Sequence, residues 1–95
     1  MSLKVQWTNR FKKDYKQCLN RGMDIGLLDS TIRQLAETGT LPPEYRDHKL
    51  SGDWEGFREC HIKPDWRLIY GKEDNGELHI LNLIRTGTHS DLFKK

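Results

Sequence analysis

The chain has 95 residues, of which 35% are hydrophobic and 32% charged, with a net charge of +2. This length predicts one domain over residues 1–95 with an ordinary core. Three Trp, three Tyr and three Phe recur with the aliphatic residues in periodic blocks, which excludes a disordered chain. No apolar run approaches the roughly 18 residues of a membrane span, and charge begins at Lys4 without a signal-like segment, so we expect a cytoplasmic protein.

Positive charge is concentrated near the N-terminus. Residues 4–21 contain one acidic residue, Asp14, against Lys4, Arg10, Lys12, Lys13, Lys16 and Arg21. Such a segment is either an electrostatic footprint for phosphate or the solvated face of a helix, and the sequence leaves both open. Two cysteines, Cys18 and Cys60, stand far apart without a C-x-x-C pair, which predicts free thiols in a reducing compartment.

The first half of the chain predicts a strand followed by two helices. Residues 4–7 alternate apolar and polar side chains, as in a strand. A helix begins near Arg10, capped by Thr8 or Asn9, and ends at Gly22; a second runs from about Asp24 to Gly39. The apolar residues at helical spacing are Phe11, Tyr15, Cys18 and Leu19, then Ile25, Leu28, Ile32, Leu35 and Ala36.

The middle of the chain changes character after Gly39. Pro42-Pro43 enforces an extended segment, and the polar residues 44–53 predict a surface loop. From Gly56 the period becomes two, which predicts a strand. One face carries Phe57, Glu59, His61 and Lys63, and the other Arg58, Cys60 and Ile62.

Two further strands are expected in the C-terminal third. Residues 66–70 form one, and a hairpin turn at Asp74-Asn75-Gly76 leads to a nearly continuous apolar run over residues 78–85, which predicts a central strand. Residues 90–93 form one helical turn. The order β-α-α-β-β-β predicts an α+β fold, with a largely antiparallel sheet and a helical hairpin packed on one face.

The histidines are the main candidates for chemistry, because imidazole titrates near neutral pH. A sheet with short turns can gather His48, His61, Asp65 and His89 at one end, where they would form an acid–base set. His79 lies within the central apolar strand, which indicates a structural role.

Three other side chains have two interpretations each. Trp66 is either a core residue or a platform on which a base stacks. Arg85 ends an apolar strand, where a cation needs a carboxylate or a phosphate, and Arg58 is a weaker case of the same kind.

Metal and nucleotide sites are not indicated by spacing. No His-x-His, His-x-x-x-His or Cys-x-x-Cys pair occurs, so we expect no metal site. The glycine-rich phosphate loops are absent as well, and we expect no cofactor.

Three blocks resemble the YafQ branch of the RelE/ParE toxin superfamily. They are D-H-x-L-x-G-x-W from Asp47, H-x-x-P-D-W from His61 and R-T-G-T-H-x-x-L-F from Arg85. The expected order of elements is similar to that family's fold. The match is detailed in the C-terminal half and covers the helical hairpin in outline.

The resemblance implies a toxin of a type II toxin–antitoxin pair, an endoribonuclease that cleaves mRNA in the ribosomal A site on the 30S subunit. It also implies an antitoxin that neutralises the toxin in an oligomeric complex. The ParE side of the superfamily cuts no RNA, so a non-catalytic toxin or an RNA- or ribosome-binding module stays the alternative. The histidine-rich blocks favour the nuclease.

The resemblance also implies site roles. They are an acid–base set of His48, His61, Asp65 and His89, nearby aromatic residues Trp66 and Phe93, and a phosphate contact at Arg85. From the chemistry of metal-free RNA cleavage we expect His89 as the acid, the base on the His61/Asp65 side with His48 assisting, and Arg85 as the phosphate clamp. Trp66, Phe93 and Arg58 are expected to bind substrate.

Overall fold

The computed structural model describes residues 3–74 and 76–93. Asn75, the middle of the predicted hairpin turn, and the Lys94-Lys95 tail lie outside these residues. The elements are β1 (Lys4–Trp7), α1 (Asn9–Asn20), α2 (Ile25–Thr38), η1 (Pro43–Tyr45), β2 (His48–Lys49), η2 (Gly52–Trp54), β3 (Arg58–Lys63), β4 (Trp66–Asp74), β5 (His79–Gly87) and α3 (His89–Leu92).

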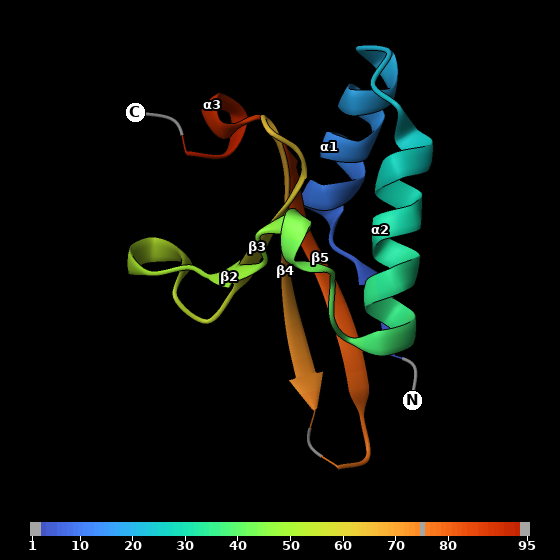
Figure 1. Ribbon diagram of the computed structural model, residues 1–95, viewed down its shortest axis with the longest axis vertical. Helices are drawn as coiled ribbons and strands as arrows, with labels where there is room; N and C mark the ends of the chain where they lie inside the picture. Colours follow the sequence, from blue (N-terminus) through green and yellow to red (C-terminus); the bar gives the residue numbers. More distant parts are fainter. Residues whose placement is uncertain (1–2, 75, 94–95) are drawn as a thin grey trace.

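The strands form one five-stranded sheet in the order β1-β5-β4-β3-β2. β1 is parallel to β5, and the other pairs are antiparallel. The α1–α2 hairpin covers one face, while β2 and α3 lie on the other side (Figure 1). The predicted α+β class, the strand–helix–helix–strand order and the inner position of β5 are therefore confirmed.

The helices begin and end where the sequence predicts. The Thr8 hydroxyl accepts a hydrogen bond from the Phe11 amide and caps α1. Gly39 ends α2 in the left-handed conformation (φ 76°), which a residue without Cβ adopts at little cost. No described helix is long and apolar enough to cross a membrane.

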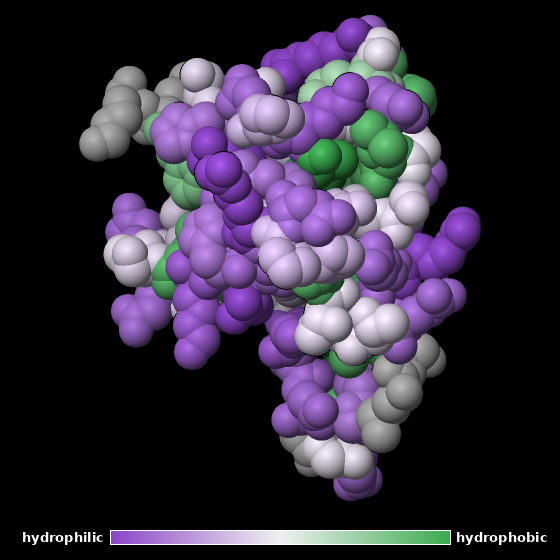
Figure 2. All heavy atoms as spheres, viewed as in Figure 1, coloured by the Kyte–Doolittle hydropathy of each residue, from purple (hydrophilic) through white to green (hydrophobic). Residues whose placement is uncertain are grey.

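The core lies between the helical hairpin and the sheet. Its fully buried side chains include Phe11, Leu28, Leu68 and Leu83, together with the free thiol of Cys60. Figure 2 shows a largely hydrophilic surface in this view, with hydrophobic side chains reaching it mainly over the helical hairpin.

Leu19 does not belong to the core, although the helical spacing predicts it there. Its side chain is exposed, while Asp14 of the same helix is buried. Asp14 can be buried because it accepts hydrogen bonds from the charged Arg85 side chain and from the Thr86 backbone amide on β5. These two donors compensate the loss of its contacts with water.

The predicted loop over residues 44–53 is wrong in one respect. His48–Lys49 forms the short edge strand β2, which pairs with β3. Two residues are too few to show an alternating pattern in the sequence, so this strand can be recognised only from its pairing with β3.

Candidate active site

Cross-strand register brings the site together. His48 pairs with Glu59 across β2 and β3, and His61 pairs with Arg67 across β3 and β4. Glu59 and His61 are two residues apart and therefore share a face, opposite Cys60, which lies in the core. The predicted alternation of this strand holds here.

Glu59 lies at the centre of this group. It is 2% exposed, and its Oε1 atom is 3.3 Å from Nε2 of His48, 3.6 Å from Nε2 of His61 and 3.7 Å from Nη1 of Arg67. Its Oε2 atom is buried and has no hydrogen-bond partner among the described residues. A buried carboxylate held in this way needs positive charge beside it.

The tautomer of neutral His48 follows from one hydrogen bond. Its Nδ1 lies 2.7 Å from the carbonyl oxygen of Arg46, which only accepts, so Nδ1 carries the proton. Arg46 adopts a left-handed conformation (φ 51°) at the end of η1, just before β2. Nε2 of His48 faces Glu59 at 3.3 Å, where the charged ring would donate to the carboxylate.

His61 is disfavoured in its charged form. Burial lowers the pKa of this imidazole, and the positive charge of Arg67 lowers it further, while Glu59 acts in the opposite direction. A neutral imidazole is therefore present at neutral pH, and its Nε2 is directed toward the same carboxylate oxygen as that of His48.

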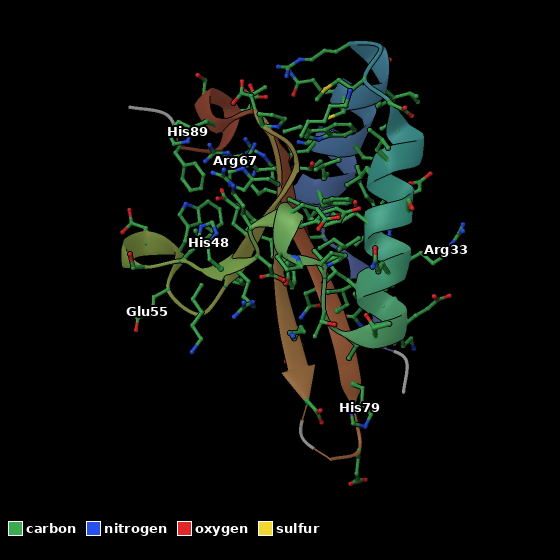
Figure 3. The ribbon with its side chains drawn as sticks, viewed as in Figure 1. Arg33, His48, Glu55, Arg67, His79 and His89 are labelled. Carbon is green, nitrogen blue, oxygen red and sulfur yellow. The ribbon has the colours of Figure 1, made fainter. Side chains whose placement is uncertain are left out.

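Arg67 connects this group to His89. Its Nη1 donates to Nδ1 of His89 at 2.9 Å, so the neutral His89 ring carries its proton on Nε2. The same nitrogen lies 3.7 Å from Glu59. The two histidines of β2 and α3 thus flank Arg67, as Figure 3 shows for His48 and His89.

The first turn of α3 fixes the position of His89. Thr88 and Asp91 form a reciprocal capping box, and the backbone amide of His89 donates to the Asp65 carboxylate at 3.2 Å. Phe93 packs against the His89 ring in a tilted arrangement, with centroids 5.1 Å apart and an angle of 42° between the planes. Asp65 therefore contacts His89, and the carboxylate beside His61 is Glu59, which corrects the expected His61/Asp65 pair.

Arg85 does not join the cluster. Its Nε and Nη2 donate to the two carboxylate oxygens of Asp14, at 2.9 and 3.1 Å. Of the two partners that the sequence allows for this cation, the structure supplies the carboxylate. The cation beside the histidines is Arg67, and the phosphate clamp at Arg85 stays a prediction.

Trp66 and Arg58, for which substrate binding stays a prediction, have structural contacts in this fold. Trp66 is 3% exposed and its Nε1 donates to the Thr86 hydroxyl, which favours the core interpretation. Arg58 donates to Asp47, which also accepts a hydrogen bond from Tyr70. Arg58 thus helps to hold the residue preceding His48.

A basic pocket adjoins the cluster. It has a volume of about 500 Å³ and is lined by Glu44, Arg46, His61, Ile62, Lys63, Pro64 and Arg67. Four of these side chains are basic or imidazole groups, so the pocket suits an anionic group such as a phosphate. His79 lies elsewhere, at the far end of the β4–β5 hairpin, paired with Asp74 at 3.0 Å (Figure 3).

Glu59 and Arg67 lie in the cluster although the sequence analysis did not predict them there. A signal existed for each: Glu59 shares the alternating face of His61, and Arg67 lies between Trp66 and Leu68 and hence on the opposite face. His48, Glu59 and His61 also offer three possible metal ligands within 4.8 Å of one another. The spacing of histidines and cysteines along the chain does not reveal this group, because one of its three members is a carboxylate.

Comparison with known proteins gives a consistent result. The family model described as "Bacterial toxin of type II toxin-antitoxin system, YafQ" matches residues 3–94. The mRNA interferase toxin YafQ of Escherichia coli (strain K12) is 38% identical over 90 residues, covering 94% of each chain.

Solved structures agree in fold. The E. coli DinJ-YafQ toxin-antitoxin complex contains a chain that is 35% identical, with a TM-score of 0.85, covering 98% of this chain and 99% of that one. A metal-bound toxin from Helicobacter pylori is 40% identical, with a TM-score of 0.84, covering 96% and 99%. With the sequence blocks, the register and these matches in agreement, the chain belongs to the YafQ family of toxins of type II toxin–antitoxin systems.

Proposed function

We propose that this toxin is an endoribonuclease that cleaves mRNA by metal-free acid–base catalysis and is neutralised by a cognate antitoxin. Its E. coli relative is named an mRNA interferase, and the E. coli toxin is found in a complex with DinJ. The observation that carries the proposed chemistry is the grouping of His48, His61 and His89 around Glu59 and Arg67.

The reaction needs three functions. A base removes the proton of a ribose 2′-hydroxyl, and the 2′-oxygen attacks the adjacent phosphorus. The bond from phosphorus to the 5′-oxygen breaks, and an acid protonates that oxygen, which leaves a 2′,3′-cyclic phosphate. A cation stabilises the charge that develops on the non-bridging oxygens.

His48 and His61 suit the role of the base. Each presents a ring nitrogen to Glu59, and the carboxylate stabilises the imidazolium that forms when either ring takes the proton. The hydrogen bond from His48 to the Arg46 carbonyl fixes the neutral tautomer with Nε2 available.

Arg67 and His89 suit the other two roles. Arg67 places its Nη1 on Nδ1 of His89 and 3.7 Å from Glu59, so its guanidinium is the cation proposed to stabilise the charge on the phosphate. His89 acts as the acid in its imidazolium form, which requires Nδ1 to part from Arg67 and take up a proton, and Nε2–H then passes its proton to the leaving 5′-oxygen. Phe93 supports the ring and offers a surface for a base.

The ribosomal A site is the proposed place of cleavage. Lys12, Lys13 and Lys16 are exposed on α1 and the basic pocket adjoins the cluster, so charged groups are available for an RNA backbone. Arg10 and Arg21 of the same basic segment pair instead with Asp14 and Asp91. Part of the predicted footprint therefore has a structural role.

A cleavage assay on a translated message tests the proposal. Toxin that has been stripped of transition metals with EDTA and then dialysed is incubated with ribosomes and a short mRNA in magnesium buffer, and the products are mapped by primer extension. We expect cuts in frame with codons only on the translated message, ending in a cyclic phosphate, and no cut where the ribose is replaced by deoxyribose. Cleavage that is absent with the stripped toxin and returns when a transition metal is added would overturn the metal-free mechanism.

Two variants separate the nuclease from a non-catalytic toxin. H89A should lose cleavage and toxicity by a factor of about 10² or more while it still folds and binds antitoxin. H79A removes a histidine outside the cluster and serves as the matched control with unchanged activity. An H89A variant that stays toxic would favour the alternative, a ParE-like inhibitor of a protein target.

A further inference from the structure

We propose that Trp54, which the mechanism above does not use, is a positioning residue that holds His89 in place through Phe93. The inference rests on the proposed function, because it concerns the histidine assigned there as the acid. Trp54 is the last residue of the block D-H-x-L-x-G-x-W that the sequence analysis singled out. It lies in η2, between the strands that carry His48 and His61.

A line of aromatic contacts joins Trp54 to His89. The Trp54 ring meets the Phe93 ring edge to face, with centroids 6.3 Å apart, and the Phe93 ring lies 5.1 Å from that of His89. On its other side Trp54 contacts the Phe57 ring, also edge to face, at 6.1 Å. Edge-to-face pairs at these distances attract each other beyond the area that they bury. A change at Trp54 is therefore transmitted to Phe93, and from Phe93 to the imidazole.

The other end of this line rests on the sheet. A Cβ atom at Gly71 of β4 would lie 3.2 Å from Cδ1 of Phe57, so the Phe57 ring packs directly against the strand backbone. Glycine at this position leaves the space that the ring fills. The contact gives the aromatic line a fixed base on the central part of the fold.

Backbone hydrogen bonds hold the loop that carries Trp54. The Phe57 amide donates to the Trp54 carbonyl oxygen at 3.1 Å, and the Leu50 amide donates to that of Phe57 at 2.9 Å. The Trp54 amide donates to the Ser51 carbonyl oxygen at 3.3 Å. Figure 1 shows this loop and α3 on the same side of the sheet. The loop is thus built to present its tryptophan to the helix that carries His89.

His89 depends on such a support during the reaction. Its hydrogen bond to Arg67 has to open before Nδ1 takes up a proton, and no other hydrogen bond from the described part of the chain holds the ring. Packing on Phe93 then keeps the exposed imidazole in place. Because a misplacement of about 1 Å can cost about 10²-fold in rate, we expect W54A to lower kcat about tenfold with KM unchanged.

A change of the leaving atom tests the proposal. A short mRNA is synthesised with sulfur in place of the 5′-oxygen at the linkage that the wild-type toxin cuts, and its cleavage on ribosomes is compared with that of the oxygen form. Sulfur leaves as a thiolate without taking up a proton, because thiols are far more acidic than alcohols. We expect H89A and W54A to be slow on the oxygen linkage and to cut the sulfur linkage at close to the wild-type rate.

The other variants separate positioning from a general loss of packing. W54F keeps an aromatic ring and should keep most of the activity, whereas W54L should behave as W54A does and replaces it if W54A does not fold. W7A is the matched control, because the Trp7 ring packs on Phe11 and Tyr15 of α1, with centroids 4.9 and 4.8 Å apart, and has no contact with this line. It should cut both linkages at wild-type rates under conditions where circular dichroism shows every variant to be folded.

The results distinguish this inference from the proposed function. If sulfur restores H89A but leaves the Trp54 variants slow, or if these variants cut the oxygen linkage as fast as the wild type, the positioning role is wrong and the acid role of His89 stands. If H89A stays slow on the sulfur linkage, or cuts the oxygen linkage normally, the proposed acid is wrong and the positioning role fails with it.

Discussion

The ion pair between Asp14 and Arg85 joins α1 to the end of β5, and its loss should be the most costly change outside the apolar core. The side chain of Asp14 is 6% exposed and that of Arg85 is 14% exposed. Asp14 accepts from Arg85 Nε and Nη2 at 2.9 and 3.1 Å, and from the Thr86 amide at 3.2 Å. The substitution D14N removes the charge and keeps the size.

The expected loss is about 3 kcal/mol. Removing one partner of a buried pair costs about 3–5 kcal/mol, because the other charge stays buried without compensation. The lower end applies because the asparagine oxygen still accepts one hydrogen bond. For a chain of this length, a loss of about 3 kcal/mol lowers Tm by roughly 12–24 °C.

Urea unfolding followed by circular dichroism measures the effect. D29N is the matched control, because Asp29 is an exposed helical aspartate bonded to Tyr15, and it should lose less than about 1 kcal/mol. The double variant D14N/R85M should be about 2 kcal/mol more stable than D14N, because the uncompensated cation is gone. A loss below about 1 kcal/mol in D14N, or a double variant no more stable than D14N, would refute the reasoning.

Three other changes have expected outcomes. Y70F removes the buried hydroxyl that donates to Asp47 and should cost about 2 kcal/mol in urea unfolding; an unchanged midpoint would contradict it. Arg21 holds the pKa of Asp91 well below its usual range, so the stabilisation is present above about pH 4 and is lost as the pH falls through the lowered pKa. D91N should lose about 1 kcal/mol at pH 7 and nothing at the acid end, measured by thermal unfolding across pH. Burial lowers the pKa of His61, so its ring protons in an NMR titration should show a midpoint below about 6.5; a midpoint above that value would show that Glu59 dominates.

Local patterns predicted much of the fold. The capping residue Thr8, the stop at Gly39 and the alternation around His61 are each decided within a few residues, and the structure has them where the sequence predicts. The short strand His48–Lys49 escaped prediction because its two residues carry no period of their own. Its pairing with β3 exists only once β3 has formed.

The candidate site was predicted in part. Three histidines that the sequence singled out do lie around one group of charges, but the central carboxylate is Glu59 and the cation is Arg67. Trp66 illustrates the limit, because a tryptophan beside a motif histidine is equally consistent with a surface platform and with a core residue. Its burial depends on the helices that pack over β4.

The sequence by itself determined the elements, their order, the family blocks and the residue types available for chemistry, because these depend on short-range spacing. Only the tertiary structure decided which charges meet. Asp14 reaches Arg85 across 71 positions of the chain, and Arg67 reaches His89 across 22. Strand register decides which charged side chains become neighbours, and each buried charge must find a partner among them. Both conditions are met only in the folded chain.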